Sequence, residues 1–387
     1  MKKILVSLVS EHPIPNILVA AQYKPADFWF ISTERMERER KSECLENTLK
    51  LMKLLSPGKV VEKIIVDQDS LTDCMSKTER LIENAGDEVE YIVNITGGNK
   101  VMALSAYEIF REIGQRVVID YMPLGKNEIV QIFPRKKPIR VVAVQKRLNL
   151  EEYLCSYGFI IQNKNSLEKV KAHALSHKEA SQWIMDNYEQ LKGVLGFLYK
   201  NLKDVRNQKG YQLSASFDRD PAKIELEILN RHGFGIKERL ITKDMKKDEI
   251  VYLTGGWFEE FMFNEVHDIV QDNILDDAMI GVKIESLTGT SNDLDIAFMK
   301  DNRFYHIECK TLGNETEQNI IREEVYKKGA ISTSLGKCEK MICTTQSQIS
   351  ECIMKRSQDY GIEILTIEQV RNLKNRLKEK FRQKNKL

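Results

Sequence analysis

The chain has 387 residues, 42% hydrophobic and 30% charged, which is ordinary for a globular protein of two or three domains. Its 59 basic and 57 acidic residues give a formal net charge of +2, which excludes a chain coated with positive charge but allows a local basic groove. No run approaches about 18 consecutive apolar residues, so we expect no membrane span. Seven scattered cysteines without a CxxC pair predict reduced thiols and a cytoplasmic protein, and six dispersed histidines predict no zinc site.

The first third alternates predicted strands with predicted helices. Met1–Val9 starts like a signal peptide, but Glu11 and Pro13 interrupt the apolar run, which favours a buried strand. Further strands are predicted at residues 27–32, 60–66, 89–95 and 116–121, with helices at 17–22, 33–55, 71–85 and 102–113. This alternation predicts an α/β domain with a parallel sheet and right-handed crossovers.

Two loops follow strands of this predicted sheet and are candidates for ligand binding. Ser10–Asn16 follows the first strand, and Thr96-Gly-Gly-Asn-Lys100 lies between the fourth strand and a helix. Ligands of such sheets bind at the carboxyl ends of the strands. Paired glycines allow close backbone approach, and a helix N-terminus with Lys100 suits a phosphate. A simple connecting turn is the alternative.

These two loops resemble those of the CARF domain, a Rossmann-like domain of CRISPR systems. The usual Thr-Gly-Gly-Thr-Lys is altered here at Asn99. The resemblance implies a homodimer that binds a cyclic oligoadenylate across its two-fold axis, with cyclic tetra-adenylate as the first expectation. It also implies the contact residues, with segment 67–70 as a further candidate: Ser10, Glu11, Asn16, Thr33, Thr96, Gly97, Gly98, Asn99 and Lys100.

The middle of the chain carries fewer signals. The first domain is expected at residues 1–145, and residues 146–245 are expected to form a mostly helical connector. Asn149 ahead of Glu151 and Glu152 predicts a helix cap, and residues 178–202 are strongly helical in pattern. The segment is interpreted as a spacer or dimerisation element, with a winged-helix-like DNA-binding module as the alternative.

A helix is predicted directly after Gly255-Gly256. Phe258, Phe261, Met262 and Val266 recur at helical spacing and are expected in the core. The helix opens with two acidic residues, Glu259 and Glu260. Acidic side chains in a first turn also suit the helix dipole, so on spacing alone this pair has a purely structural explanation.

Residues 293–310 predict a β-hairpin with a turn at residues 300–303. Asp293 and Asp295 share a face of the first strand, and Glu308 and Lys310 share a face of the second. In the simplest register Asp295 and Glu308 meet near the open end, beside Lys310. Two carboxylates can hold a hard divalent cation, and a neighbouring ammonium group suits phosphodiester hydrolysis. A hairpin with a charged, solvated face is the alternative.

The series Asp295, then Glu308-Cys-Lys310, resembles the PD-(D/E)xK nuclease superfamily, although Leu294 stands where the family has proline. The resemblance implies that Asp295 and Glu308 bind Mg²⁺ or Mn²⁺ and that Lys310 orients the attacking water. It also implies a third carboxylate from the preceding helix, for which Glu259 is chosen and Glu260 kept in reserve. The nuclease domain is expected at residues 246–387 with a restriction-endonuclease-like α/β fold.

Together the two halves resemble the ancillary nucleases of type III CRISPR systems. The resemblance implies a nuclease that cleaves DNA or RNA when a cyclic oligoadenylate binds. Two other functions stay open: a ligand-gated transcription regulator with an inactive C-terminal domain, and a ring nuclease that degrades its own messenger.

Overall fold

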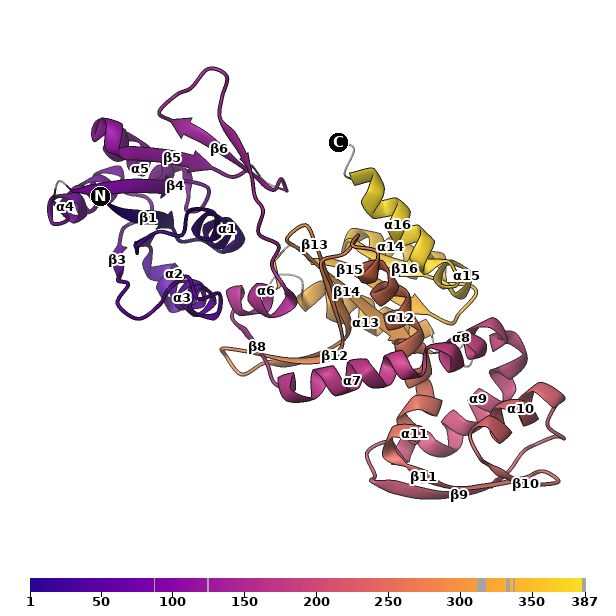
Figure 1. Cartoon of the computed structure of the whole chain (residues 1–387). Helices are drawn as coiled ribbons and strands as arrows, with labels where there is room; N and C mark the ends of the chain where they lie inside the picture. The colour runs from indigo at the N-terminus through magenta and orange to yellow at the C-terminus, as the bar shows by residue number, and fades with distance from the viewer. Residues whose placement is uncertain (87, 124, 312–317, 332–334, 337, 385–387) are drawn as a thin grey trace.

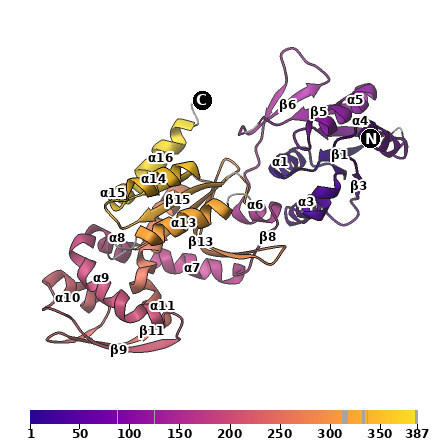
Figure 2. The same ribbon diagram turned by 180° about the vertical axis from the view of Figure 1, so that it is seen from behind.

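The computed structural model describes the chain except residues 87, 124, 312–317, 332–334, 337 and 385–387. Its three sheets lie in a row in space: one of seven strands, one of six strands and one of three strands. Figures 1 and 2 show the six-stranded sheet between the other two. The two large sheets are therefore neighbours, although a hundred residues of middle segment separate them in the chain.

The front sheet has the order β3-β2-β1-β4-β5-β6-β7, with β1 to β5 parallel and β6 and β7 antiparallel. All five predicted strands are present. The loops after β1 and β4 lie side by side because these strands pair. The elements are β1 (Lys2–Leu8), α1 (Ile14–Tyr23), β2 (Asp27–Ser32), α2 (Glu34–Arg38), α3 (Lys41–Leu51), β3 (Val61–Ile65), α4 (Leu71–Glu83), β4 (Val89–Asn94), α5 (Lys100–Glu112), β5 (Val117–Tyr121), β6 (Glu128–Phe133) and β7 (Val141–Ala143).

The single helix predicted over residues 33–55 is wrong, because the structure divides it into α2 and α3. Arg40 lies between them with φ +58°, a left-handed conformation that ends α2. Its guanidinium is paired with Glu43 at 2.6 Å in the first turn of α3. Helical periodicity continues through the break, so the sequence pattern did not reveal it.

The middle segment is mostly helical, as predicted, but it also contributes strands. It comprises α6 (Leu150–Ser156), β8 (Phe159–Ile161), α7 (Lys164–Ser176), α8 (Lys178–Asp186), α9 (Tyr188–Leu202), β9 (Gly210–Ser216), α10 (Lys223–Arg231), β10 (Gly235–Lys237) and β11 (Leu240–Lys246). β8 joins the edge of the six-stranded sheet, and β9 to β11 form the small sheet. Asn149 forms the predicted cap of α6, as part of a capping box with Glu152.

The six-stranded sheet has the order β16-β15-β14-β13-β12-β8. Its hairpin strands β13 and β14 pair antiparallel around the predicted turn, where Asp301 and Asn302 both have positive φ. Such a two-residue turn fixes the register of the hairpin. The elements of this part are α11 (Lys247–Val251), α12 (Trp257–Gln271), β12 (Asp277–Ser286), β13 (Ser291–Lys300), β14 (Arg303–Lys310), α13 (Gln318–Ile331), β15 (Cys338–Thr344), α14 (Glu351–Asp359), β16 (Ile362–Leu365), α15 (Ile367–Val370) and α16 (Leu373–Lys384).

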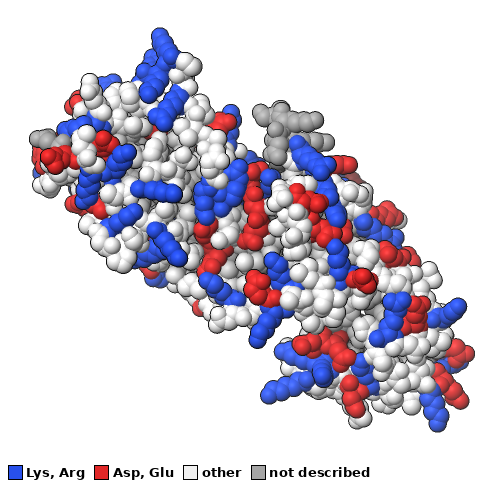
Figure 3. All heavy atoms as spheres, viewed as in Figure 1, with Lys and Arg blue, Asp and Glu red and all other residues white. Residues whose placement is uncertain are grey.

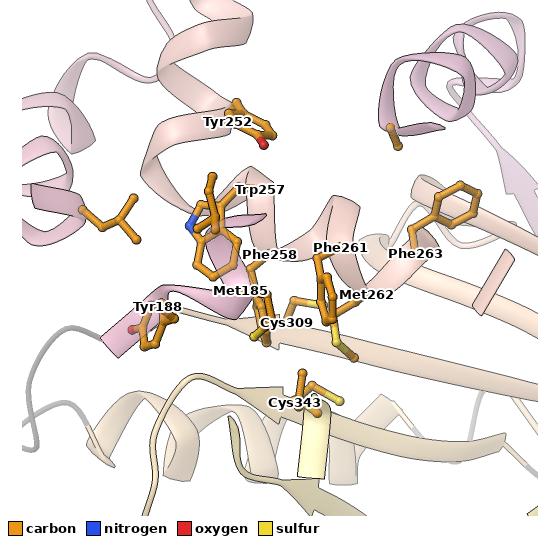
Figure 4. Close-up of a cluster of buried hydrophobic side chains, with 14 of the residues drawn as sticks. Met185, Tyr188, Tyr252, Trp257, Phe258, Phe261, Met262, Phe263, Cys309 and Cys343 are labelled. Atoms are coloured by element: carbon orange, nitrogen blue, oxygen red, sulfur yellow. The ribbon is translucent and has the colours of Figure 1, made fainter. Parts of the chain in front are cut away.

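The apolar face of α12 forms the centre of the largest core. Phe258, Phe261, Met262 and Val266 are fully buried, as their spacing predicted. Figure 4 shows the side chain of Phe258 close to Cys309 of β14. Burial of apolar surface stabilises a fold by about 25 cal/mol per Å², so these side chains hold α12 against the sheet. The position of its first turn is fixed as a result.

A second core joins the front domain to the six-stranded sheet through α6. It contains residues of α1 and α3 together with residues of β12, β13 and β14. Within it, the ring of Tyr153 on α6 stacks on Phe304 of β14 with a centroid distance of 5.2 Å. The domains thus share a continuous apolar contact.

Candidate functional site

The open end of the β13–β14 hairpin carries the first two predicted carboxylates. The pairing of Ile296 with Ile307, continued by one residue, sets Asp295 opposite Glu308. The Cys309 backbone N–H donates to Asp295 Oδ2 at 2.8 Å. Glu308 is 5% exposed and Asp295 is partly buried. Both carboxylates therefore belong to one site at the edge of the core.

Lys310 lies among three carboxylates at this site. Its Nζ is 2.8 Å from Glu308 Oε1 and 3.4 Å from Oε1 of Glu324 on α13. Burial lowers the pKa of Lys310, but Glu308, Glu324 and Asp295 outweigh burial and hold that pKa above its usual range. Lys310 is therefore an ammonium group at neutral pH, suited to stabilise negative charge rather than to accept a proton.

The third carboxylate, Glu259, comes from the first turn of α12. Burial raises its pKa to about 8, and the Asp295 and Glu308 carboxylates add to this rise. Arg206 and Lys310 oppose the rise through their positive charge. The structure thus gathers the four residues predicted for catalysis, Asp295, Glu308, Lys310 and Glu259, into one electrostatically coupled group.

Glu260, the reserve candidate, points elsewhere. Its oxygens contact His173 Nδ1 at 3.2 Å and His177 Nδ1 at 2.9 Å. The helix starts after a kink at Tyr252–Gly256, where Gly255 has φ +131°, a conformation that a residue with Cβ rarely adopts. This kink sets the rotation of α12, which places Glu259 rather than Glu260 beside the hairpin.

Two residues of this site were missed by the sequence analysis. Arg206 follows α9 in the middle segment and acts on Glu259 electrostatically, and Glu324 approaches Lys310 from α13. Neither has a fixed spacing from the hairpin motif. Arg206 is also more than fifty residues from Glu259, so only the folded chain brings them together.

A cavity of about 740 Å³ lies between the middle segment and the start of α12. Its lining includes Trp257 and Thr311, the residue after Lys310. Four basic side chains also line it: Lys192, Lys200, Lys203 and Arg219. Basic side chains of the middle segment therefore share a cavity with the residue that follows Lys310.

The predicted glycine loop closes tightly onto β1. A Cβ on Gly97 would collide with the carbonyl oxygen of Leu8, and Gly98 has φ +67°. Asn99 caps α5 by accepting from the Met102 N–H at 2.9 Å, and its Nδ2 donates to the Gln68 carbonyl at 2.7 Å. Both glycines are therefore required by the backbone, and Asn99 serves the helix start.

The predicted ligand residues divide into buried and accessible ones. Asn16 is buried, where it donates to the Leu8 carbonyl and accepts from Asn94 Nδ2 at 2.7 Å. Thr33 is buried as the cap of α2. Both side chains hold the loops in place, and their contact with a ligand stays a prediction.

The other loop residues are at least partly accessible. Lys100 is exposed, Ser10 is partly exposed, and the exposed Glu11 pairs with Arg35. Thr96 accepts from the Met122 N–H at 2.8 Å, which ties the glycine loop to the loop after β5. Figure 3 also shows basic side chains gathered on the front domain beyond β6.

A second cavity, of about 670 Å³, lies between the front domain and the six-stranded sheet. Thr96, Met122 and Asn127 line it from the front domain, and Asn302 and Arg303 line it from the hairpin turn. Across its edge Arg303 Nη2 donates to the Gly125 carbonyl at 2.8 Å. The hairpin that carries the carboxylates at one end therefore contacts the side of the front domain that carries the glycine loop at its other end.

Comparison with known proteins gives two family matches. Residues 4–153 match the Card1 CARF domain, and residues 246–384 match the Card1-like endonuclease domain. No curated protein matches the sequence. Among the described residues, no helix is long and apolar enough to cross a membrane.

The solved structures of similar fold include the following three. Protein VC1899 from Vibrio cholerae has a TM-score of 0.80 and 18% identity over 98% of each chain. Can2 from Sulfobacillus thermosulfidooxidans, solved with cyclic tetra-adenylate, has a TM-score of 0.75 and 19% identity over 97% of this chain and 98% of that one. A type III CRISPR defence DNA nuclease activated by cyclic oligoadenylate has a TM-score of 0.53 and 14% identity over 89% of this chain and 46% of that one.

Proposed function

The chain belongs to the Card1-like proteins, which join a CARF domain to an endonuclease domain, and on this premise we propose that it is a metal-dependent nuclease switched on by a cyclic oligoadenylate. The biological setting is type III CRISPR defence in the cytoplasm. One observation carries the proposal: Asp295, Glu308 and Glu259 converge beside Lys310.

The residues of the site suit Mg²⁺ or Mn²⁺. All three acidic groups offer oxygen, the ligand that these hard cations prefer. Burial and, to a lesser extent, the Asp295 and Glu308 carboxylates raise the pKa of Glu259, and a bound cation would favour its ionised form. A bound divalent cation would supply Lewis-acid stabilisation and a more acidic water. Asp295, Glu308 and Glu259 would hold it.

The protein's own cations complete the chemistry. Lys310 Nζ, held by Glu308, stabilises the charge that develops on the phosphoryl oxygens and orients the attacking water. Arg206 of the middle segment acts electrostatically on Glu259 and adds positive charge to the site. The basic cavity binds the phosphates of DNA or RNA and brings a phosphodiester to these groups.

The activator site lies at the carboxyl ends of β1 and β4. Thr96, Gly97, Gly98 and Lys100 face a cyclic tetra-adenylate, whose phosphates approach the N-terminus of α5. Two copies of the chain share one ring across a two-fold axis, because a ring of four identical units presents the same face to each protomer. The Thr96–Met122 hydrogen bond and the Arg303–Gly125 contact transmit the change to the hairpin.

The test is a cleavage assay with the full chain. Cyclic oligoadenylates of different ring size are each mixed with Mn²⁺ and labelled single- or double-stranded DNA or RNA. We expect cleavage only when a ring and Mn²⁺ are both present, with cyclic tetra-adenylate the most effective. Absence of cleavage of every nucleic acid, with ring binding intact, would contradict the proposal and favour a ligand-gated regulator. Shortened oligoadenylate products alone would indicate a ring nuclease.

A further inference from the structure

Two histidines and a glutamate meet at the start of α12, where the glutamate is the residue after Glu259. His173 lies in the last turn of α7, His177 follows that helix, and Glu260 lies in the first turn of α12. Their ligand atoms all lie within 4.8 Å of one another. The dispersed histidines gave no sign of this cluster, because Glu260 is more than eighty residues away in the chain.

The geometry of the cluster fits a metal ion. Residues four apart on a helix share a face, and here the two imidazole rings have a centroid distance of 4.2 Å. Both Nδ1 atoms point at Glu260, at 3.2 and 2.9 Å. Ligands bound about 2.0–2.2 Å from a tetrahedral metal ion lie about 3.3 Å apart, so the two His–Glu distances are already close to those of bound ligands.

The cluster is also accessible. The side chains of His173 and His177 are 45% and 35% exposed, whereas that of Glu260 is 12% exposed. The glutamate thus forms the floor of a site that is open to solvent. Three protein ligands with one open position is a common arrangement for zinc.

We propose that His173, His177 and Glu260 form a second metal site, selective for Zn²⁺ or a similar transition-metal ion. Imidazole nitrogen favours such ions, whereas the all-oxygen set of the nuclease site favours Mg²⁺ or Mn²⁺. The ion clamps α7 to the start of α12, beside the contact in which Asn264 Nδ2 donates to the Ala174 carbonyl at 2.9 Å. This function is independent of the nuclease and of its activator.

The experiment is a calorimetric titration of the full-length chain with Zn²⁺ in excess Mg²⁺, which occupies the oxygen-only site. We expect one Zn²⁺ per chain. The double variant His173→Gln/His177→Gln should bind it at least about 100-fold more weakly, because even outer-shell partners of a metal change affinity by 10- to 100-fold. Glu260→Gln, which keeps a carbonyl oxygen near the rings, should weaken binding by at least about tenfold.

A matched control is His267→Gln, which removes a partly buried histidine from the same helix α12 outside the cluster. It should bind Zn²⁺ like the unaltered chain. Thermal unfolding without zinc shows whether the double variant folds, and Glu260→Gln serves if it does not. Undiminished Zn²⁺ binding by the folded double variant, or by Glu260→Gln in its place, would overturn the proposal. So would a Co²⁺ spectrum with thiolate charge-transfer bands in the unaltered chain.

Discussion

Asn302 at the tip of the β13–β14 hairpin donates from Nδ2 to Oδ1 of Asn127 in the CARF domain at 2.9 Å. The same side chain accepts from the Leu148 N–H at 2.8 Å, and its Nδ2 also reaches the Lys146 carbonyl at 3.0 Å. Asn302 is 7% exposed. One buried amide therefore joins the sensor, the segment that leaves it and the hairpin that carries Asp295.

This relationship gives the first prediction. Asn302→Gly removes the amide while it keeps the positive φ of 61°, which glycine adopts freely. Loss of buried hydrogen bonds costs about 1–3 kcal/mol, so stimulation of cleavage by the ring should fall about tenfold or more while ring affinity stays within about twofold. Stimulation equal to that of the unaltered chain would show that the signal takes another route.

The second prediction concerns the metal ligands. Asp295→Ala should lower the cleavage rate by about 10³-fold or more, because it removes a charged group from a preorganised electrostatic site. Asp293→Ala is the matched control, since Asp293 lies on the same strand and the same face but is exposed. Rates are measured at saturating ring and Mn²⁺. Equal rates for the two variants would remove Asp295 from the mechanism.

The third prediction is a pH dependence. Burial, reinforced by Asp295, raises the pKa of Glu259 to about 8, so Mn²⁺ must displace a proton from this carboxyl at neutral pH. Mn²⁺ affinity should therefore rise with pH and level off above about 8. Glu259→Gln should bind Mn²⁺ more weakly and without this rise, whereas Glu323→Gln, an exposed control on α13, should behave like the unaltered chain.

The raised pKa of Glu259 also affects the free energy of unfolding of the metal-free protein. A carboxyl whose pKa is higher in the folded state stabilises the fold at low pH, and this contribution is lost as pH rises toward about 8. Glu259→Gln should abolish the part of the pH-dependent loss of stability that Glu259 causes. The measurement is the free energy of chemical unfolding at several pH values with a chelator present. A variant that loses stability with pH as steeply as the unaltered chain would show that Glu259 has an ordinary pKa.

The fourth prediction concerns the activator. Lys100→Ala removes an exposed charge at the N-terminus of α5, so affinity for cyclic tetra-adenylate should fall about tenfold or more, the scale of one charge-assisted hydrogen bond. Arg111→Ala, near the other end of α5, should leave affinity unchanged. Calorimetry measures both, and equal affinities would place the ring elsewhere.

The features that could be predicted from the sequence are those set by local patterns. Side chains that alternate between the two faces along residues 293–310, together with a two-residue turn, predicted the hairpin. Its register then predicted that Asp295 lies opposite Glu308. The glycines of Thr96–Lys100 gave a tight loop, which only residues without Cβ allow where Gly97 meets Leu8. The parallel sheet followed from alternating strands and helices. The ligand and metal roles of these residues stay predictions.

The features that could not be predicted depend on tertiary packing. Arg206 acts electrostatically on Glu259 because the middle segment folds back beside the endonuclease domain, which no spacing in the chain encodes. The side chain of Asn16 is hydrogen-bonded to the Leu8 carbonyl and to Asn94 inside the domain, and these bonds were not predicted. A polar residue in a loop has the same sequence pattern with or without such partners, and its contact with a ligand stays a prediction.

The most direct test of the shared cation is anomalous diffraction from crystals of the full chain soaked in Mn²⁺. The account predicts one strong peak about 2.2 Å from carboxylate oxygens of Asp295 and Glu308, with Glu259 beside it. A Mn²⁺ peak that contacts neither Asp295 nor Glu308, or no peak at this end of the hairpin, would contradict it.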